Sequence, residues 1–146
     1  MALRLYLLTV GHIVGLALSV GASTVKLFLL LKCRKDPSFA KVYLEVAKTI
    51  TRLIIAGMIL LTLSGIGFLV VGFPFTPRLA VKLFLVVALW VLGPIIDNVF
   101  EPRFRTLALH ADAPASRAFI KARRRYVAVE IFATSLFYLI ILIWQW

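Results

Sequence analysis

The chain contains 146 residues, and 62% of them are hydrophobic. Soluble domains contain about 45–50% apolar residues. The excess falls into long runs, so it excludes an ordinary soluble protein and predicts a single membrane domain over residues 1–146. Lysine and arginine outnumber the acids by 17 to 6, for a net charge of +11. The lone cysteine, Cys33, excludes an internal disulfide and a multi-cysteine metal site, and we expect a reduced thiol there rather than an acylated one.

The first apolar run covers about residues 5–31, and His12 and Lys26 are the ionisable groups within it. A cleaved signal peptide is the alternative interpretation, because residues 21–23 are small enough for a cleavage site. The run is far longer than a signal core of about 7–15 residues, however. We therefore interpret it as a membrane span.

Three more apolar runs follow, at about residues 50–72, 79–100 and 126–146. Each is near the roughly 20 residues that a helix needs to cross the hydrocarbon core. The turn Phe73–Pro77 separates the second run from the third, and Pro94 inside the third removes a helix hydrogen bond and predicts a kink. The sequence therefore predicts an all-α fold, an antiparallel four-helix transmembrane bundle.

Polar connections at residues 32–48 and 101–125 join the two spans of each hairpin. Each connection contains a signal for a helix start, Asp36–Pro37 in the first and Asp112–Pro114 in the second. We therefore expect the second and fourth spans to begin as helices before they enter the membrane.

The basic residues lie mainly beside these two connections. Six of the 17 lie in or near the first connection and seven in or near the second, which makes 13. Basic loops stay in the cytoplasm, so we expect both termini outside a bacterial inner membrane, with Trp144 and Trp146 in an outer aromatic belt. The same distribution explains the net charge. We interpret the Arg123–Arg125 run as a contact for anionic lipid rather than for nucleic acid.

Five ionisable residues lie inside the spans, at two depths. Placing such a group inside the membrane costs a few kcal/mol of free energy, so its side chain usually faces the interior of the bundle or a cavity. His12 lies about seven residues, or roughly 10 Å, below the outer surface, and Lys82 enters from the same side on the third span. Lys26, Asp97 and Glu130 lie near the cytoplasmic face on spans one, three and four. The sequence thus predicts an outer level and an inner charged cluster.

One face of the first span joins these two levels. At about 100° per residue, a narrow arc contains His12, Gly15, Ser19, Ser23 and Lys26. Small residues at such spacing favour close contact with another membrane helix. On the second span, Ser64, Gly65 and Gly67 would leave room for a ligand beside the histidine.

Each level also has a purely structural interpretation. Lys26 paired with an acid would fix the register of the helices while its ammonium reaches toward the cytoplasm; the alternative is proton or ion handling. His12 would be a hydrogen-bonded packing residue rather than a ligand, and Lys82 would extend to the outer surface. His110, in a polar connection, is expected to be solvated.

Short motifs on three spans indicate a relationship to known proteins. They are Gly11-His12 and Gly21-Ala22 on the first span, Ser64-Gly65 on the second, and Arg78 to Lys82 at the start of the third. With these residues the chain resembles the small four-helix bacterial membrane proteins related to the HemJ protoporphyrinogen oxidases and the CopD copper-resistance domain. The resemblance implies haem b as cofactor, His12 as the ligand of its iron and Lys82 as a catalytic residue.

The chain also departs from that family at several positions. Ser19 stands where the family has a tryptophan, and Gly93 or Asp97 lies where a further histidine is expected. The family's Asn-Glu pair near the fourth span corresponds only to Glu130.

Three functions remain open at this point. The leading hypothesis is a haem- or porphyrin-binding redox protein, in which a bis-histidine site would need a second copy or a partner, because His12 is the lone intramembrane histidine. The second is a CopD-like carrier of a small ion or metal, with Met58 and His12 as candidate ligands. The third is a non-catalytic accessory or assembly subunit of a larger membrane complex.

Overall fold

The computed structural model describes residues 2–109 and 116–143, and these residues form helices and turns. In chain order the elements are α1 (Ala2–Lys35), the 3₁₀ turn η1 (Pro37–Phe39), α2 (Ala40–Val70), α3 (Pro77–Ile95), the π-helical turn η2 (Ile96–Phe100), α4 (Glu101–Ala108) and α5 (Arg117–Leu142). Four helices in this part of the chain are long and apolar enough to cross a membrane: Ala2–Cys33, Ala40–Val70, Pro77–Ala108 and Arg117–Leu142. The predicted all-α four-helix membrane fold is confirmed.

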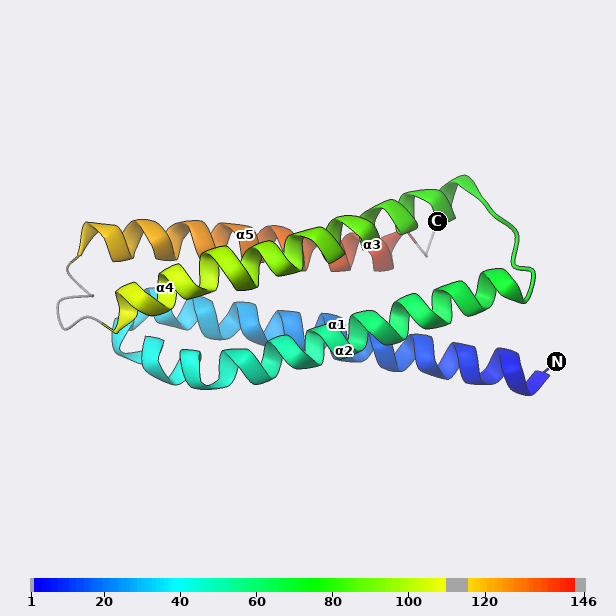
Figure 1. Cartoon of the computed structure of the whole chain (residues 1–146), viewed down its shortest axis with the longest axis horizontal. Helices are drawn as coiled ribbons and strands as arrows, with labels where there is room; N and C mark the ends of the chain where they lie inside the picture. Colours follow the sequence, from blue (N-terminus) through cyan, green and yellow to red (C-terminus); the bar gives the residue numbers. More distant parts are fainter. Residues whose placement is uncertain (1, 110–115, 144–146) are drawn as a thin grey trace.

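Two helical hairpins lie side by side, α1 with α2 and the α3–η2–α4 helix with α5 (Figure 1). We call the end that holds η1, the end of α4 and the start of α5 the connection end (Figure 1). The opposite end, which holds the start of α1 and the turn from α2 to α3, is the terminal end (Figure 1). Many large apolar side chains on all four helices are exposed, as contact with lipid requires.

Helices α1 and α2 lie in close contact where two glycines meet. A Cβ atom built on Gly15 would lie 2.9 Å from the carbonyl oxygen of Gly57, and one built on Gly57 would lie 2.8 Å from that of Gly15. Real Cβ contacts are essentially never so short, so either side chain would push the helices apart. The predicted inward face is confirmed here, because Gly15, Ser19, Ser23 and Lys26 are all buried.

The third span differs from the prediction at its end. We expected it to stop near Phe100, but the helix continues through the π turn into α4 and reaches Ala108. Pro94 and Pro102 stand on either side of this π turn, and neither can donate a backbone hydrogen bond. The side-chain amide of Asn98 donates to the carbonyl of Pro94 (2.9 Å). The π turn begins two residues after Pro94, where a kink is predicted, and the continued helix brings Glu101 into the bundle.

The helix start predicted at Asp36 is present as a short turn that leads into α2. The carboxylate of Asp36 accepts hydrogen bonds from the hydroxyl of Ser38 (2.6 Å) and from its backbone N–H (3.0 Å). These hydrogen bonds hold the pKa of Asp36 below its usual value. The other predicted start, Asp112–Pro114, lies outside the described residues, as do His110, Trp144 and Trp146.

An aromatic core fills the connection end. Tyr43, Phe104, Phe119 and Tyr126 are all buried, and the rings of Phe104 and Phe119 stack with centroids 5.5 Å apart. These rings come from α2, α4 and α5, so they tie the two hairpins together at this end. The inner charged cluster lies directly beside this core.

Candidate functional site

The ammonium of Lys26 lies inside the bundle among carboxylates from two other helical segments. Its Nζ atom is 2.9 Å from Oε1 of Glu130 on α5 and 3.4 Å from Oδ1 of Asp97 in η2. A third carboxylate, Oε2 of Glu101 on α4, is 3.7 Å away. The Lys26 and Glu130 side chains are only 3% and 4% exposed, so this charge pair is withdrawn from solvent and lipid. We call these four residues the Lys26 cluster.

The structure brings together the three residues of the predicted inner level and adds Glu101, which sequence reasoning missed. Glu101 had been assigned to the polar connection after the third span. The spacing between Asp97 and Glu101 could have predicted its position, because residues four apart share one face of a helix. That prediction requires a helix that continues past Phe100. The π turn keeps both carboxylates near Lys26.

A hydrogen-bonded chain of two tyrosines reaches the cluster from the connection end. The hydroxyl of Tyr126 donates to Oε2 of Glu101 (3.3 Å), and the hydroxyl of Tyr43 lies 2.7 Å from that of Tyr126. Because Tyr126 has a single proton to donate, Tyr43 is the donor in the second bond. Both tyrosines are fully buried. The chain runs from α2 through α5 to α4.

The cluster has more negative than positive charge. Arg105 adds a second cation, with Nη2 3.5 Å from Oε1 of Glu101, although its side chain is 45% exposed. Among the described side chains, these ion pairs set three carboxylates against two cations, which leaves one negative charge in excess. An unbalanced charge away from water is costly, and such a group usually takes up a proton or a counter-ion.

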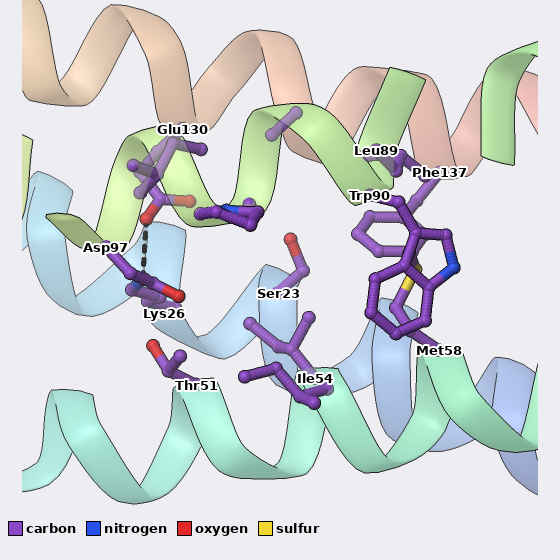
Figure 2. Close-up of a pocket in the computed structure, with 15 residues that line it drawn as sticks. Ser23, Lys26, Thr51, Ile54, Met58, Leu89, Trp90, Asp97, Glu130 and Phe137 are labelled. Atoms are coloured by element: carbon purple, nitrogen blue, oxygen red, sulfur yellow. Dashed lines mark hydrogen bonds and ion pairs between the residues drawn. The ribbon is translucent and has the colours of Figure 1, made fainter. Parts of the chain in front are cut away.

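A cavity of about 140 Å³ opens from the cluster toward the middle of the bundle. Figure 2 shows Lys26, Asp97, Glu130 and Thr51 at one end, and apolar side chains that include Trp90 at the other. The hydroxyl oxygen of Thr51 is buried in the cavity wall and has no hydrogen-bond partner within the described part of the chain. The cavity therefore offers a polar end with an unsatisfied hydroxyl and an apolar end.

The outer level forms a separate site near the terminal end. Nδ1 of His12 lies 2.9 Å from the hydroxyl oxygen of Ser64, and the imidazole ring contacts Phe68 edge to face. The Ser64 hydroxyl donates to the carbonyl of Leu60 (2.7 Å), so it accepts from His12. Nδ1 therefore holds the proton, and Nε2 keeps its lone pair. Lys82 lies close enough for its charge to act on His12, so both predicted residues of the outer level lie near the terminal end.

The surroundings of His12 provide a test of the haem that the resemblance implies. The donor fits: the neutral imidazole has an available Nε2 atom, and Ser64 holds the ring by its other nitrogen, as is usual for a metal-ligating histidine. The cavity beside the Lys26 cluster does not supply the space for a haem here, because His12 is not among its lining residues. We expected Ser64, Gly65 and Gly67 to leave room for a ligand here. The side chain of Leu8 fills the space over Gly67, whereas a Cβ atom on Gly65 would meet nothing within 4 Å.

Cys33 ends the first span in a buried position. Its thiol donates to the carbonyl of Leu29 (3.3 Å), and Nη1 of Arg123 donates to the carbonyl of Cys33 (3.2 Å). The side chain is fully buried. It therefore packs between α1 and α5 and is a poor target for water-soluble thiol reagents.

No family model, no curated protein and no solved structure matches this chain. The chain remains an integral membrane protein with four spanning helices in its described part. Its function has to be argued from the two sites.

Proposed function

We propose that the protein is a membrane carrier that exchanges a small cation for a proton at the Lys26 cluster. The observation that supports this function is the excess of carboxylates around Lys26 and Arg105. The cluster needs one further positive charge to be neutral, and either a proton or a bound cation supplies it. Because each replaces the other without a change in total charge, neither state leaves an unbalanced charge inside the membrane.

The surrounding groups suit such an exchange. The Tyr43–Tyr126–Glu101 hydrogen bonds would let a proton pass from Tyr43, near the connection end, to the cluster. The cavity opens on the other side of the cluster, at Asp97 and Glu130, and offers a place for the cation. Ionisable groups in membrane spans commonly mark ion and proton pathways.

The test is proton flux in vesicles that contain the purified protein and an internal pH indicator. We expect an imposed cation gradient to drive protons in the opposite direction. Asp97→Asn and Glu130→Gln should each lower the exchange rate by about tenfold or more, because each removes about 1.4 kcal/mol or more of stabilisation from the bound state. Glu45→Gln is the matched control, since Glu45 is an exposed acid on α2. No proton movement under any cation gradient would contradict the carrier.

A second candidate function is haem ligation at His12, the hypothesis that the resemblance suggested. The hydrogen bond to Ser64 favours it, because it leaves Nε2 available to ligate iron. A bound haem would supply one-electron redox chemistry. Lys82 would pair with a propionate or donate a proton. Since the cavity does not include His12, the macrocycle would lie between two copies or against a partner subunit.

A visible spectrum tests this second candidate. Protein purified from haem-supplemented cells should show a Soret band that His12→Ala removes and Lys82→Met keeps. Circular dichroism should show that His12→Ala is folded at the temperature of the spectrum, so that loss of the band reports ligation and not misfolding. A colourless parent protein after haem reconstitution would contradict haem ligation and would leave the carrier proposal unaffected.

The distribution of basic residues supports a cytoplasmic connection end, with anionic lipid against it and both termini outside. A test places cysteines in a Cys33→Ala background, because the native thiol is buried. A membrane-impermeant reagent added to intact cells should label Phe75→Cys, in the exposed turn between α2 and α3, and spare Lys41→Cys on the exposed surface of α2. The reverse pattern would contradict this orientation.

A further inference from the structure

We propose that the cavity beside the Lys26 cluster takes a small organic ammonium ion, with its charge at Asp97 and its apolar body against Trp90. This inference rests on the proposed carrier function and names the class of its cargo. The size of the cavity, the chemistry of its walls and the position of its opening each support it.

The volume limits the cargo to a small molecule. An engineered cavity of about 150 Å³ in another protein binds benzene. The cavity here has nearly the same volume, about 140 Å³. It therefore accommodates a single ring or a compact aliphatic group, and it is too small for a drug-sized ligand, which occupies at least about 300 Å³.

The walls favour an organic cation over a bare metal ion. Hard cations such as Ca²⁺ take about 6–8 oxygen ligands. The polar end of the cavity offers few, because the hydroxyl of Ser23 is already bonded to Thr134 (2.9 Å) and Glu130 is engaged by Lys26 (2.9 Å). Asp97, whose Oδ1 atom makes only a longer contact with Lys26 (3.4 Å), and the unbonded hydroxyl of Thr51 together suit the hydrogen-bond donors of one ammonium group.

The remaining walls are apolar and partly aromatic. Met58 from α2, Leu89 and Trp90 from α3, and Phe137 from α5 face the polar end across the cavity (Figure 2). Such walls contribute the hydrophobic contact that small-ligand sites require, and an indole face also attracts cations. An inorganic ion has no carbon skeleton to bury against these side chains, whereas an organic ammonium does.

The cavity opens toward the lipid between α2 and α3. The exposed lining residues, Ile55 (42%), Trp90 (38%) and Pro94, lie on these two helices. Nε1 of Trp90 donates to the hydroxyl of Thr62 on α2 (3.1 Å), so the indole spans the gap between the helices. An amphiphilic ammonium partitioned into the bilayer can reach the cavity at this point.

The experiment is calorimetric titration of the full chain in lipid nanodiscs with benzylammonium. Benzyl alcohol serves as a neutral probe of similar shape, and sodium chloride as an inorganic cation. We expect benzylammonium to bind about tenfold or more tightly than benzyl alcohol. Repetition in buffers of different ionisation enthalpy should show one proton released for each ammonium ion bound. Sodium should not compete.

Two pairs of variants separate the cavity from the rest of the protein. A Cβ atom on Gly93, which lines the cavity, and one on Gly65, which does not, would each meet open space. Gly93→Leu should therefore fill the cavity and weaken binding by about tenfold or more, while Gly65→Leu should bind like the parent. Asp97→Asn should weaken binding by about thirtyfold or more, since it removes the partner of a buried charge, and Glu45→Gln should have no effect.

The outcomes distinguish this inference from the carrier proposal. If sodium or potassium drives proton exchange but benzylammonium neither binds nor exchanges, the carrier stands and the cargo assignment is overturned. Equal binding of benzyl alcohol and benzylammonium would also overturn it, and this comparison needs no variant. Unchanged binding in a folded Gly93→Leu protein would place the ligand elsewhere. If no cation binds or moves protons, both proposals fail.

Discussion

The Lys26 cluster and the His12 site lie on the same face of α1, yet their polar groups are satisfied in different ways. His12 makes a hydrogen bond within its own hairpin, to Ser64 of α2. Lys26 instead contacts acids from α5, η2 and α4, all in the other hairpin. A misplaced neutral group loses one hydrogen bond, whereas a misplaced charge loses several ion pairs in a medium that cannot solvate it. We infer that the cluster holds the two hairpins together and that the histidine does not.

Removal of the Lys26 ammonium should have the largest effect on stability. Lys26→Ala leaves three carboxylates without their central cation. We expect a loss of about 3–5 kcal/mol in the free energy of unfolding, as for other broken buried pairs. His12→Ala on the same helix should lose about 1–3 kcal/mol, the usual effect of removing a partner from a buried hydrogen bond. Unfolding of both variants by SDS in mixed micelles measures the difference.

A double variant sharpens this prediction. Glu130→Ala added to Lys26→Ala should restore part of the lost stability, because it removes the carboxylate that lies nearest to the missing ammonium. Glu45→Ala, which alters an exposed acid of α2, is the control and should restore nothing. Simple additivity of the two cluster substitutions would mean that Lys26 and Glu130 do not stabilise each other, and the proposed role of the cluster in holding the hairpins would be wrong.

The contact between α1 and α2 lies between the His12 site and the Lys26 cluster. A substitution there should lower the unfolding free energy less than Lys26→Ala does. Gly15→Leu places a side chain against the backbone of Gly57, where a Cβ atom already lies too close. We expect a loss of about 1–3 kcal/mol in unfolding free energy, the usual effect of overpacking. Gly11→Leu is the matched control one helical turn away, where a Cβ atom meets nothing. Equal loss in both variants would show that helix propensity or lipid contact, and not packing at Gly15, limits stability.

Hydrophobic runs were sufficient to predict the spans, because each run of about 20 apolar residues has few structural alternatives. Depth counting was sufficient to place Lys26, Asp97 and Glu130 together, since depth along a straight helix follows from sequence. Glu101 could not be placed in this way. Its burial depends on a helix that continues through a π turn between two prolines, and proline in a sequence usually predicts an ending.

The cavity and the filled space over Gly67 depend on side chains that are far apart in the sequence. Leu8 occupies that space because α1 and α2 pack closely, and their distance is set at Gly15 and Gly57. A glycine in a sequence indicates the absence of a side chain, but not whether a neighbouring helix fills the gap. For this reason the small residues predicted the helix contact correctly, whereas the space expected beside His12 is filled over Gly67 and open over Gly65.

Removal of the Ser64 hydroxyl should have the smallest effect on stability, and it tests the hydrogen bond of His12 specifically. Ser64→Ala removes the acceptor of the His12 Nδ1 proton and should lower the unfolding free energy by about 1 kcal/mol. Ser135→Ala is the matched control, since Ser135 makes the same type of hydrogen bond to a carbonyl four residues earlier but is exposed and has no histidine partner there. Nitrogen NMR shifts of labelled His12 should report a proton on Nδ1 in the parent and in Ser135→Ala. In Ser64→Ala the two neutral tautomers should mix, because nothing holds the proton on Nδ1. A parent spectrum with the proton on Nε2 would contradict the assignment, and with it the availability of that atom as a ligand.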